Sequence, residues 1–560
     1  MPPMPINAAI LFEPEAYVLD GPKLMGRQAA GNAYLRAAVQ GRGGETLSAY
    51  SPRKQSGDVF ARLVRDIDAR ATTQWIPATR LDLVAAAGSL HLPGPVLGEA
   101  ANLRLRAGPA AYSLTGVTHT TASHAAMDAV AGLLSQPLMP WDALISTSKS
   151  VLSTIETVLG AERDYLRWRY GSEIKLPMPQ LPVIPLGVHC GDFAFDAGDR
   201  AHAREALGLA EDEVVALFVG RLSFHAKAHP AQMYLGLEAA AKRSGKKIVL
   251  LQCGWFANEA IERAFKEGAH RHCPGVRAIF SDGRNEEVRR RSWAAADIFV
   301  SLSDNVQETF GLAPVEAMAA GLPVVATDWD GYKDTIRDGV DGFLIPTTMP
   351  APGAGGRFAF VHEAGEANYD TYCGLICRTV SVDAAALEAR LTELAGSPEL
   401  RRRLGLSGRA RARAEFDWSL IYRRYQELWA ELGRIRGRAS SDPKLTAWIS
   451  GAPKAASGRL DPFQAFAHYP TRLIGLETLV SVVPGSDAAR YGVLAADPLF
   501  SYAPEALPSE ALAGAMLDML RLGPVSLQAL AEKLNIDPRR VVTAIAILAK
   551  MGLVCLAWSA

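Results

Sequence analysis

The sequence predicts an α/β protein with two Rossmann-like, doubly wound domains followed by a small, mainly helical, winged-helix-like domain. The chain has 560 residues, which is more than one hydrophobic core usually supports. Short apolar runs alternate with segments of helical periodicity, and such runs are what a parallel sheet covered on both faces requires. After about residue 440 this rhythm gives way to helices separated by turns.

The predicted strands are apolar runs bounded by turn residues, at 8–12, 143–147, 182–185, 214–220, 247–254, 276–280, 297–303 and 322–327. These runs are too many for one sheet. Because 182–193 has the pattern of a strand ending in a turn, we place a boundary there. The predicted domains are 1–190, 191–435 and 440–560, and closure over a ligand is expected to use hinges near 185–192 and 416–432.

Two segments depart from the strand–helix rhythm. Residues 347–380 are rich in Pro and Gly, which predicts an inserted surface loop. The stretch "RRRLGLSGRARARAEF", residues 401–416, is rich in arginine. A solvated helical face with Glu partners is favoured over a nucleic-acid patch.

Composition excludes several classes of protein. The formal net charge is zero, with 49% hydrophobic and 21% charged residues, so nothing global favours nucleic acid or an acidic membrane. No apolar stretch approaches the roughly 20 residues that span a bilayer, and the N-terminus lacks the pattern of a signal peptide. The six cysteines are scattered and are interpreted as isolated thiols, not as a disulfide framework or metal site. A cytoplasmic protein without a metal is expected.

The stretch "QETFGLAPVEAMAAG", residues 307–321, carries the strongest chemical signal. It follows a predicted strand, and the carboxyl end of such a strand is where open α/β sheets bind ligands. The backbone at Phe310, Gly311 and Leu312 is expected to offer free N–H groups to an anion at a helix start. Glu308 in the loop and Glu316, expected in the first helical turn, suit sugar or ribose hydroxyls. For Glu316, complementing the helix dipole is an equal alternative.

A second anion element lies upstream. In "VVALFVGRLSFHAK", a predicted strand leads into Gly220, and Arg221 and Lys227 follow. Paired cations after a strand can neutralise a departing diphosphate. The element is weak alone, but its combination with the two-glutamate loop is specific.

Residues 214–346 resemble the donor half of retaining glycosyltransferases of the GT-B fold, the group 1 or family 4 enzymes. The resemblance rests on "GRLSFHAK", on Glu308-x7-Glu316 with its flanks, and on "DGVDGFLIP". In the N-terminal half it is thinner, and it rests on "GRQAAG" at 26–31, "VTHTTAS" at 117–123 and "PVIPLGVHCGDF" at 182–193. It covers roughly residues 6–435.

The resemblance implies a role for each matching residue. Arg221 and Lys227 hold the donor diphosphate, Glu308 lies near the sugar hydroxyls, and Glu316 holds the ribose. His119 contacts the sugar near the reacting carbon, although a packed polar residue is an alternative and His124 is a rival. The implied catalytic residues are His119, Glu308, Arg221 and Lys227, and the implied donor-binding residues are Gly26, Gly31, Gly220, Phe310, Gly311, Leu312 and Glu316.

Two departures from the family pattern affect this assignment. Six positions instead of five separate Arg221 from Lys227, so the loop has an extra residue and Lys227 is open to displacement. The family's acidic residue after the next strand is replaced by "DGYKD", which leaves Asp330, Lys333 and Asp334 as alternatives.

The implied activity is transfer of a hexose from a nucleoside-diphosphate sugar, a UDP-sugar or GDP-sugar, with retention and without a further cofactor. The loop 12–31 mixes carboxylates, cations and an aromatic residue, which favours a soluble small-molecule, peptide or protein acceptor. Lys23 and Arg27 are predicted to line the acceptor side. The alternatives are a catalytically silent nucleotide-sugar-binding protein and a transcription regulator that senses nucleotide sugars.

The C-terminal region has the order helix, helix, helix, short strand. Its third helix, from Asp537, is largely apolar, whereas a DNA-reading helix is basic and polar. A protein-contact or homo-oligomerisation module is therefore favoured, and nucleic acid binding is not expected. The apolar, aromatic segment 461–480 is expected to pack onto the catalytic body.

Overall fold

The computed structural model describes residues 6–19, 26–172 and 176–558. The chain divides into two compact units, Met1–Ala456 and Ser457–Ala560. This division falls later than the predicted start of the third domain near 440. The reason is that helices α18 (Trp418–Ser441) and α19 (Pro443–Ser450) contribute Ala439, Leu445 and Ile449 to a cluster around buried Trp141 of the first unit.

The first unit contains two parallel six-stranded sheets, each with the strand order of the Rossmann fold. The N-terminal sheet has the order β3-β2-β1-β4-β5-β6. Its strands are β1 (Ala9–Leu11), β2 (Leu47–Ser51), β3 (Thr73–Pro77), β4 (Ser89–His91), β5 (Ser113–Val117) and β6 (Ala143–Ile145). Its helices are α1 (Pro14–Tyr17), α2 (Gly26–Gly41), α3 (Lys54–Ile67), α4 (Leu81–Ala87), α5 (Gly98–Arg104), α6 (His124–Ala131) and α7 (Lys149–Tyr170).

The second sheet has the order β12-β11-β10-β7-β8-β9. Its strands are β7 (Val214–Val219), β8 (Ile248–Gly254), β9 (Arg277–Asp282), β10 (Ile298–Ser301), β11 (Val324–Thr327) and β12 (Gly342–Ile345). Its helices are α8 (Ala197–Ala206), α9 (Ala231–Ser244), α10 (Glu259–His272), α11 (Glu286–Ala295), α12 (Leu312–Ala320), α13 (Tyr332–Thr335), α16 (Ala384–Gly396) and α17 (Pro398–Arg411). The predicted fold class is confirmed.

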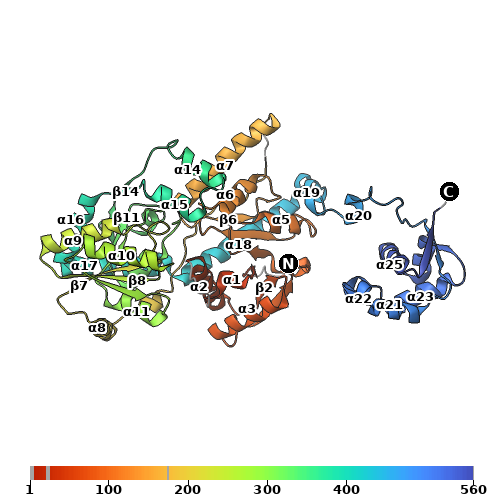
Figure 1. Ribbon diagram of the computed structural model, residues 1–560, viewed down its shortest axis with the longest axis horizontal. Coiled ribbons are helices and arrows are strands. Elements are labelled where there is room, and N and C mark those ends of the chain that lie inside the picture. The colour runs from red at the N-terminus through yellow and green to blue at the C-terminus, as the bar shows by residue number, and fades with distance from the viewer. Residues whose placement is uncertain (1–5, 20–25, 173–175, 559–560) are drawn as a thin grey trace. The chain divides into compact units, whose positions relative to one another are not determined.

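Helix α18 returns the chain from the second sheet to the first domain, where it lies among the N-terminal elements in Figure 1. The aromatic residues Trp418, Tyr422, Tyr425 and Trp429 are buried there with residues of β1, α2 and α3. Two of them also make hydrogen bonds, from Tyr422 Oη to the Asn7 side chain at 2.8 Å and from Trp429 Nε1 to Thr115 Oγ1 at 3.1 Å. Four large buried aromatics, two of them with hydrogen-bonded polar tips, hold this helix in the first domain, although the buried Trp418 Nε1 has no hydrogen-bond partner among the described residues.

The segment 347–380 is not the surface loop that its composition predicts. It contains β13 (Thr347–Thr348), α14 (Gly356–Glu363) and α15 (Tyr369–Cys377), and β14 (Ser381–Val382), which pairs with β13, follows directly after it. Asn368 caps α15 by accepting a hydrogen bond from the Thr371 N–H at 2.9 Å, and Cys373 and Cys377 of this helix are buried. The Pro residues and most of the Gly residues lie before α14 or at its start, so the composition of the whole segment concealed the two helices.

Strand prediction failed in one place and was incomplete in others. Residues 182–185 form only an isolated bridge, between Val183 and Ser146, because the chain passes the sheet edge there without extending it. Strands β2, β3, β4, β5 and β12 were not predicted. Several are short or carry polar residues, as in "LSAYS" and "TQWIP".

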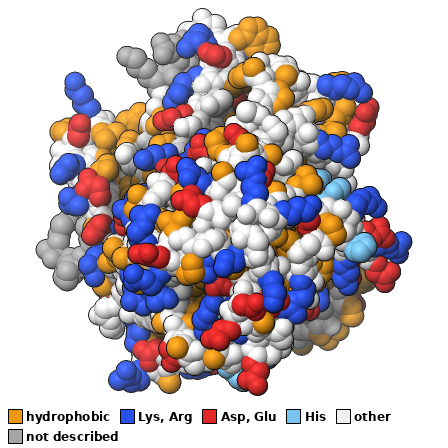
Figure 2. Space-filling model, turned by 90° about the vertical axis from the view of Figure 1, so that its left-hand side faces the viewer, with side chains coloured by type: hydrophobic (Ala, Val, Ile, Leu, Met, Phe, Trp, Pro, Cys, Tyr) orange, Lys and Arg blue, Asp and Glu red, His pale blue; other side chains and the backbone are white. Residues whose placement is uncertain are grey.

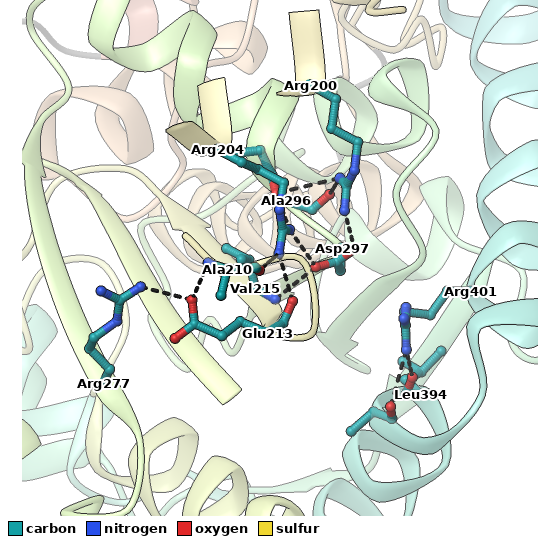
Figure 3. Close-up of polar contacts among 12 residues, drawn as sticks. Arg200, Arg204, Ala210, Glu213, Val215, Arg277, Ala296, Asp297, Leu394 and Arg401 are labelled. Atoms are coloured by element: carbon teal, nitrogen blue, oxygen red, sulfur yellow. Dashed lines mark hydrogen bonds and ion pairs between the residues drawn. The ribbon is translucent and has the colours of Figure 1, made fainter. Parts of the chain in front are cut away.

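The arginines of the second domain are largely structural. Figure 3 shows Arg200 and Arg204 converging on Asp297, at 2.5 and 3.2 Å, which ties α8 to the start of β10. In the arginine-rich stretch, Arg409 donates to the Ala320 carbonyl and Arg411 to the Thr335 carbonyl, at 2.6 and 2.9 Å. On the face in Figure 2, Lys and Arg are interspersed with Asp and Glu.

The second unit has a three-stranded antiparallel sheet, β16-β15-β17, and its own apolar core. Asp537 caps α25 and Pro538 is the first residue of the helix, as predicted. The whole of segment 461–480 falls in the second unit, where Ile474 and Leu476 pack against this core, so it is assigned to that unit and not to the catalytic body. The elements are α20 (Pro462–Ala465), β15 (Leu479–Val482), α21 (Ala488–Ala496), α22 (Pro498–Ser501), α23 (Glu510–Leu520), β16 (Val525–Ser526), α24 (Leu527–Leu534), α25 (Pro538–Lys550) and β17 (Val554–Ala557).

Two further features of the described residues are the apolarity of the helices and the exposure of the cysteines. Among the described helices, none combines the length and apolarity that crossing a bilayer would take. Five cysteines are buried and unpaired, and only Cys555 is exposed. Burial raises the pKa of all five, which lowers the reactivity of their thiols.

A buried ion pair provides a stability test of the first domain. Arg104 and Asp142 are both fully buried and bidentate, with N–O distances of 2.6 and 2.7 Å, and Asp142 also accepts from the Leu114 and Met139 N–H groups. We expect Asp142→Ala to lower the free energy of unfolding by about 3–5 kcal/mol, because it leaves a buried guanidinium unpaired. Urea unfolding measures this. Asp82→Ala breaks an exposed pair with Arg80 and should change little; equal losses in the two variants would contradict the argument.

Candidate functional site

The two predicted anion elements come together at one point of the second sheet. Strands β7 and β10 are hydrogen-bonded neighbours, and the sheet order reverses between them. Ligands in open α/β sheets bind at such a switch point, outside the carboxyl ends of the strands. The loop 220–229 follows β7 and the loop 302–311 follows β10, so the topology brings these loops side by side.

Lys227 and Glu308 form an ion pair across the two loops. Their side chains are 28% and 11% exposed, so the pair lies at the edge of solvent. Burial acts against the charge of Glu308, but the nearby Lys227 ammonium outweighs it and holds the pKa of this carboxyl below its ordinary value. The extra loop residue therefore does not carry Lys227 away from the site.

The loop after β7 is held in place by side chains of the loop after β10. Asn305 donates to the His225 carbonyl at 2.8 Å, and Asp304 accepts from the His229 N–H at 3.2 Å. Arg221 donates to the Ala226 carbonyl at 3.0 Å and to Gln307 Oε1 at 2.9 Å. Arg221 and Lys227 are thus held relative to Glu308 by contacts within the protein.

Gly311 begins helix α12 and needs to be glycine for two reasons. Its φ is +80°, in the left-handed region, and a Cβ there would lie 2.0 Å from the Tyr332 ring. The Phe310 side chain is buried in the core, so only its backbone can face a ligand. With Leu312 as the first helical residue, the helix start has the geometry expected of an anion site.

The sequence suggested that Glu316 lies in the first turn of α12. The structure places it in the second turn. Because dipole stabilisation decays within one turn, complementing the helix dipole does not explain this residue. Burial raises the pKa of Glu316 to about 7, although the positive charges of Arg289 and Lys227 oppose the shift. A carboxyl kept partly protonated beside cations suits hydrogen bonding to a hydroxyl.

The structure brings His119 to the Glu308 loop. Thr309 Oγ1, next to Glu308, donates to the His119 carbonyl at 3.2 Å. Burial lowers the pKa of His119 to about 4, against a hydrogen bond to the Pro93 backbone, so the imidazole is neutral near pH 7. Its rival His124 is exposed and stacks on His362, with ring centroids 3.9 Å apart.

The predicted residues of the N-terminal glycine loop, residues 23–31, have different outcomes in the structure. Arg27 is exposed in the first turn of α2, close enough to His119 for its charge to contribute to the lowered pKa of that residue. Gly26 starts the helix with open space around its Cα. At Gly31 a Cβ would lie 2.1 Å from the Ala16 carbonyl oxygen, so close packing on α1 by itself requires glycine here, and the diphosphate contact stays a prediction. Lys23 lies outside the described residues.

Asp330 is the site residue that the sequence left undecided. It has a φ of +44°, which is unusual for a residue other than glycine, and such strain concentrates at functional sites. Burial, and next the charge of Glu308, raises the pKa of Asp330 to about 7. A departure from the family's pattern at "DGYKD" was the only sequence signal for it.

Contacts from the N-terminal domain close one side of the site. Ser148, at the start of α7, donates to the Thr309 carbonyl at 2.8 Å and lies 3.4 Å from Asp330 Oδ1. The Lys149 N–H donates to Asp334 at 2.6 Å. The site is therefore built from both Rossmann-like domains, with Asp330 and Asp334 facing the amino end of α7.

Residues 199–352 match the model of the family Glycosyl transferases group 1. This match contains the loops after β7 and β10. A D-inositol 3-phosphate glycosyltransferase of Geodermatophilus obscurus is 34% identical over 229 residues, which is 39% of this chain and 49% of the relative. One from Nocardia farcinica is 28% identical over 206 residues, or 36% and 41%. The chain spans about half the length, or less, of these curated relatives.

Solved structures with similar folds share little sequence with the chain. Alr3699/HepE of Anabaena, solved in complex with UDP and glucose, has a TM-score of 0.47 and 17% identity, covering 76% of this chain and 100% of its own. Sucrose-phosphate synthase of Thermosynechococcus elongatus has a TM-score of 0.47 and 18% identity, with 77% and 100% covered.

The raised pKa of Glu316 makes stability depend on pH. Because the folded pKa exceeds that of the unfolded chain, the stabilisation from the retained proton is lost as pH rises from about 4.5 to about 7. Glu316→Gln removes this dependence, so we expect it to gain about 2 kcal/mol relative to wild type between pH 5 and pH 8. Urea unfolding at both pH values measures the gain. Glu211→Gln, at an exposed position, is the control, and a pH-independent difference for Glu316→Gln would exclude the explanation.

Proposed function

We propose that this protein transfers a hexose from a nucleoside-diphosphate sugar to a soluble acceptor, with retention at the anomeric carbon, as a GT-B glycosyltransferase. The observation that carries the proposal is the meeting of Arg221, Lys227 and the α12 amino end with Glu308, at the sheet's switch point. The family match over 199–352, which contains these groups, supports the same reaction class.

The arrangement fits the electrostatic demands of the reaction. Charge grows on the departing diphosphate, and Arg221, Lys227 and the backbone N–H group of Leu312 lie where they can receive it, while the Gly311 N–H bonds the Glu308 carboxylate. These groups take the place that a metal ion occupies elsewhere, so no cofactor is invoked. Donor phosphate would compete with Glu308 for Lys227, which would leave the carboxylate free to accept from sugar hydroxyls.

Retention requires the acceptor to enter from the leaving-group face, or a covalent carboxylate intermediate. Glu308 is ionised and, besides its pair with Lys227, accepts from the Thr309 and Gly311 N–H groups, which suits a fixed acceptor for sugar hydroxyls better than a nucleophile. We therefore favour attack on the leaving-group face, with neutral His119 close to the reacting carbon. NMR of the product's anomeric proton tests retention, since an inverted product excludes both of these routes.

The acceptor is proposed to be small and polar. The relatives are named for D-inositol 3-phosphate, a soluble polyol phosphate. Arg27 offers a cation beside His119 for such an anionic or hydroxyl-rich acceptor. We expect Arg27→Ala to raise the acceptor KM and to leave donor affinity nearly unchanged. A collapse of donor affinity would instead place Arg27 in the diphosphate site.

Loss of one diphosphate cation tests the reaction class. We expect Lys227→Ala to lower kcat by roughly 10²–10³-fold at saturating donor, because a preorganised charge is removed from the transition state. The donor is first chosen from a panel of UDP- and GDP-sugars by thermal shift, since binding to the folded state raises the melting temperature. Lys246→Ala, exposed in a turn on another edge, is the matched control. Binding without transfer by the wild type would instead identify a silent nucleotide-sugar-binding protein.

A further inference from the structure

Helix α15 of the segment 347–380 places a tyrosine hydroxyl between the two loops that carry candidate catalytic residues. Gln307 Nε2 donates to Tyr369 Oη at 3.1 Å, and Thr120 Oγ1 lies 3.4 Å from the same oxygen. Gln307 immediately precedes Glu308, and Thr120 immediately follows His119. Tyr369 lies beyond the family match, which ends at residue 352.

The position of α15 is fixed against the loop that carries Arg221 and Lys227. Cys377 Sγ lies 3.5 Å from the Phe224 carbonyl oxygen, and a Cβ on Gly374 would lie 3.1 Å from the His225 Cβ. Cys373 and Cys377 are buried beneath the helix. Helix α15 therefore packs on the loop 220–229, which carries Arg221 and Lys227, and it does not project into solvent.

A second contact joins the same segment to the N-terminal domain. His362 of α14 stacks on His124 with ring centroids 3.9 Å apart, and on Tyr372 of α15 with centroids 4.5 Å apart. His362 Nδ1 lies 2.7 Å from the Ala367 carbonyl oxygen, which fixes the ring plane. The segment thus packs on the second domain and also contacts the N-terminal domain at two places, at Thr120 and at His124.

Side chains form a continuous chain of hydrogen bonds across the site. Arg221 donates to Gln307 Oε1, Gln307 Nε2 donates to Tyr369 Oη, and Tyr369 keeps a proton that it can share with the Thr120 hydroxyl, where either oxygen can be the donor, or with the neighbouring Cys373 thiol. Burial raises the pKa of Tyr369, so its hydroxyl keeps that proton at neutral pH. The chain runs from a candidate diphosphate ligand to the loop of His119.

We propose that Tyr369 is a positioning residue that holds the His119 loop at a fixed distance from Glu308 and makes segment 347–380 part of the catalytic site. The proposal rests on the proposed transferase function, which it deepens. Tyr369 acts through Gln307 and Thr120, so its loss affects the transition state, where a misplaced group is costly, more than the binding of donor.

The test compares two Tyr→Phe variants one turn apart. Tyr369→Phe removes the bridging hydroxyl, whereas Tyr372→Phe keeps the ring that stacks on His362 and loses a hydroxyl with no role in the chain. Tyr369→Phe is expected to lower kcat about tenfold with donor Kd within about twofold, because two hydrogen bonds are lost. Tyr372→Phe is expected to keep wild-type kcat. Thr120→Val should act like Tyr369→Phe, and the double variant should lose no more than either alone.

Hydrogen exchange of the ligand-free full chain gives a second readout that does not depend on turnover. Tyr369→Phe should speed amide exchange in residues 118–123 and 305–309 together, and Tyr372→Phe should leave both at wild-type rates. If Tyr369→Phe keeps wild-type kcat and exchange, or if Tyr372→Phe loses as much activity, the positioning role is overturned. If wild type neither binds nor uses any nucleotide sugar, the transferase function fails, and hydrogen exchange alone decides whether Tyr369 links the loops.

Discussion

The return of the chain through α18 is the constraint on which the rest of the first unit depends. The chain leaves the N-terminal sheet once, builds the second sheet, and then comes back to bury Trp418, Tyr422 and Trp429 in the first core. The backbone of Val188, on the outward crossing, pairs with that of Phe416 and Trp418 on the return, at 2.8 and 3.1 Å. Both crossings are thereby joined at one place, and the carboxyl ends of the two sheets share a site.

Within that site, each of the two cations has partners in the protein. Lys227 forms an ion pair with Glu308, and Arg221 donates to the neutral Gln307 side chain and to the Ala226 carbonyl. The proposed donor diphosphate has to offer these two cations more than their present partners do, which a dianion does better than a single carboxylate. Selectivity thus follows from the groups that the ligand has to displace.

Much of this was accessible from the sequence, for physical reasons. The loops after β7 and β10 were predicted because the positions of their glycines, cations and carboxylates are set by local backbone geometry and by the chemistry of phosphate binding. Strands β2 and β3 were missed because alternating or polar strands resemble loops. The helical character of 347–380 was hidden by flanking Pro and Gly, and Tyr369 has no local signal, since its meaning lies in a contact with Thr120 far away in the chain. Asp330 was left open because its role depends on a backbone angle.

The cysteines differ in exposure, so their rates of chemical modification can report how often different parts of the structure open. Cys555 is exposed, whereas Cys190 lies at the crossing between the domains and Cys373 and Cys377 lie under α15. A thiol reagent should therefore modify Cys555 at once and reach the others only when the structure around them opens. The modification rates of these buried thiols can be followed by mass spectrometry without an engineered label. The rate at Cys190 would measure how often the crossing between the domains opens, and the rates at Cys373 and Cys377 would measure the opening of α15.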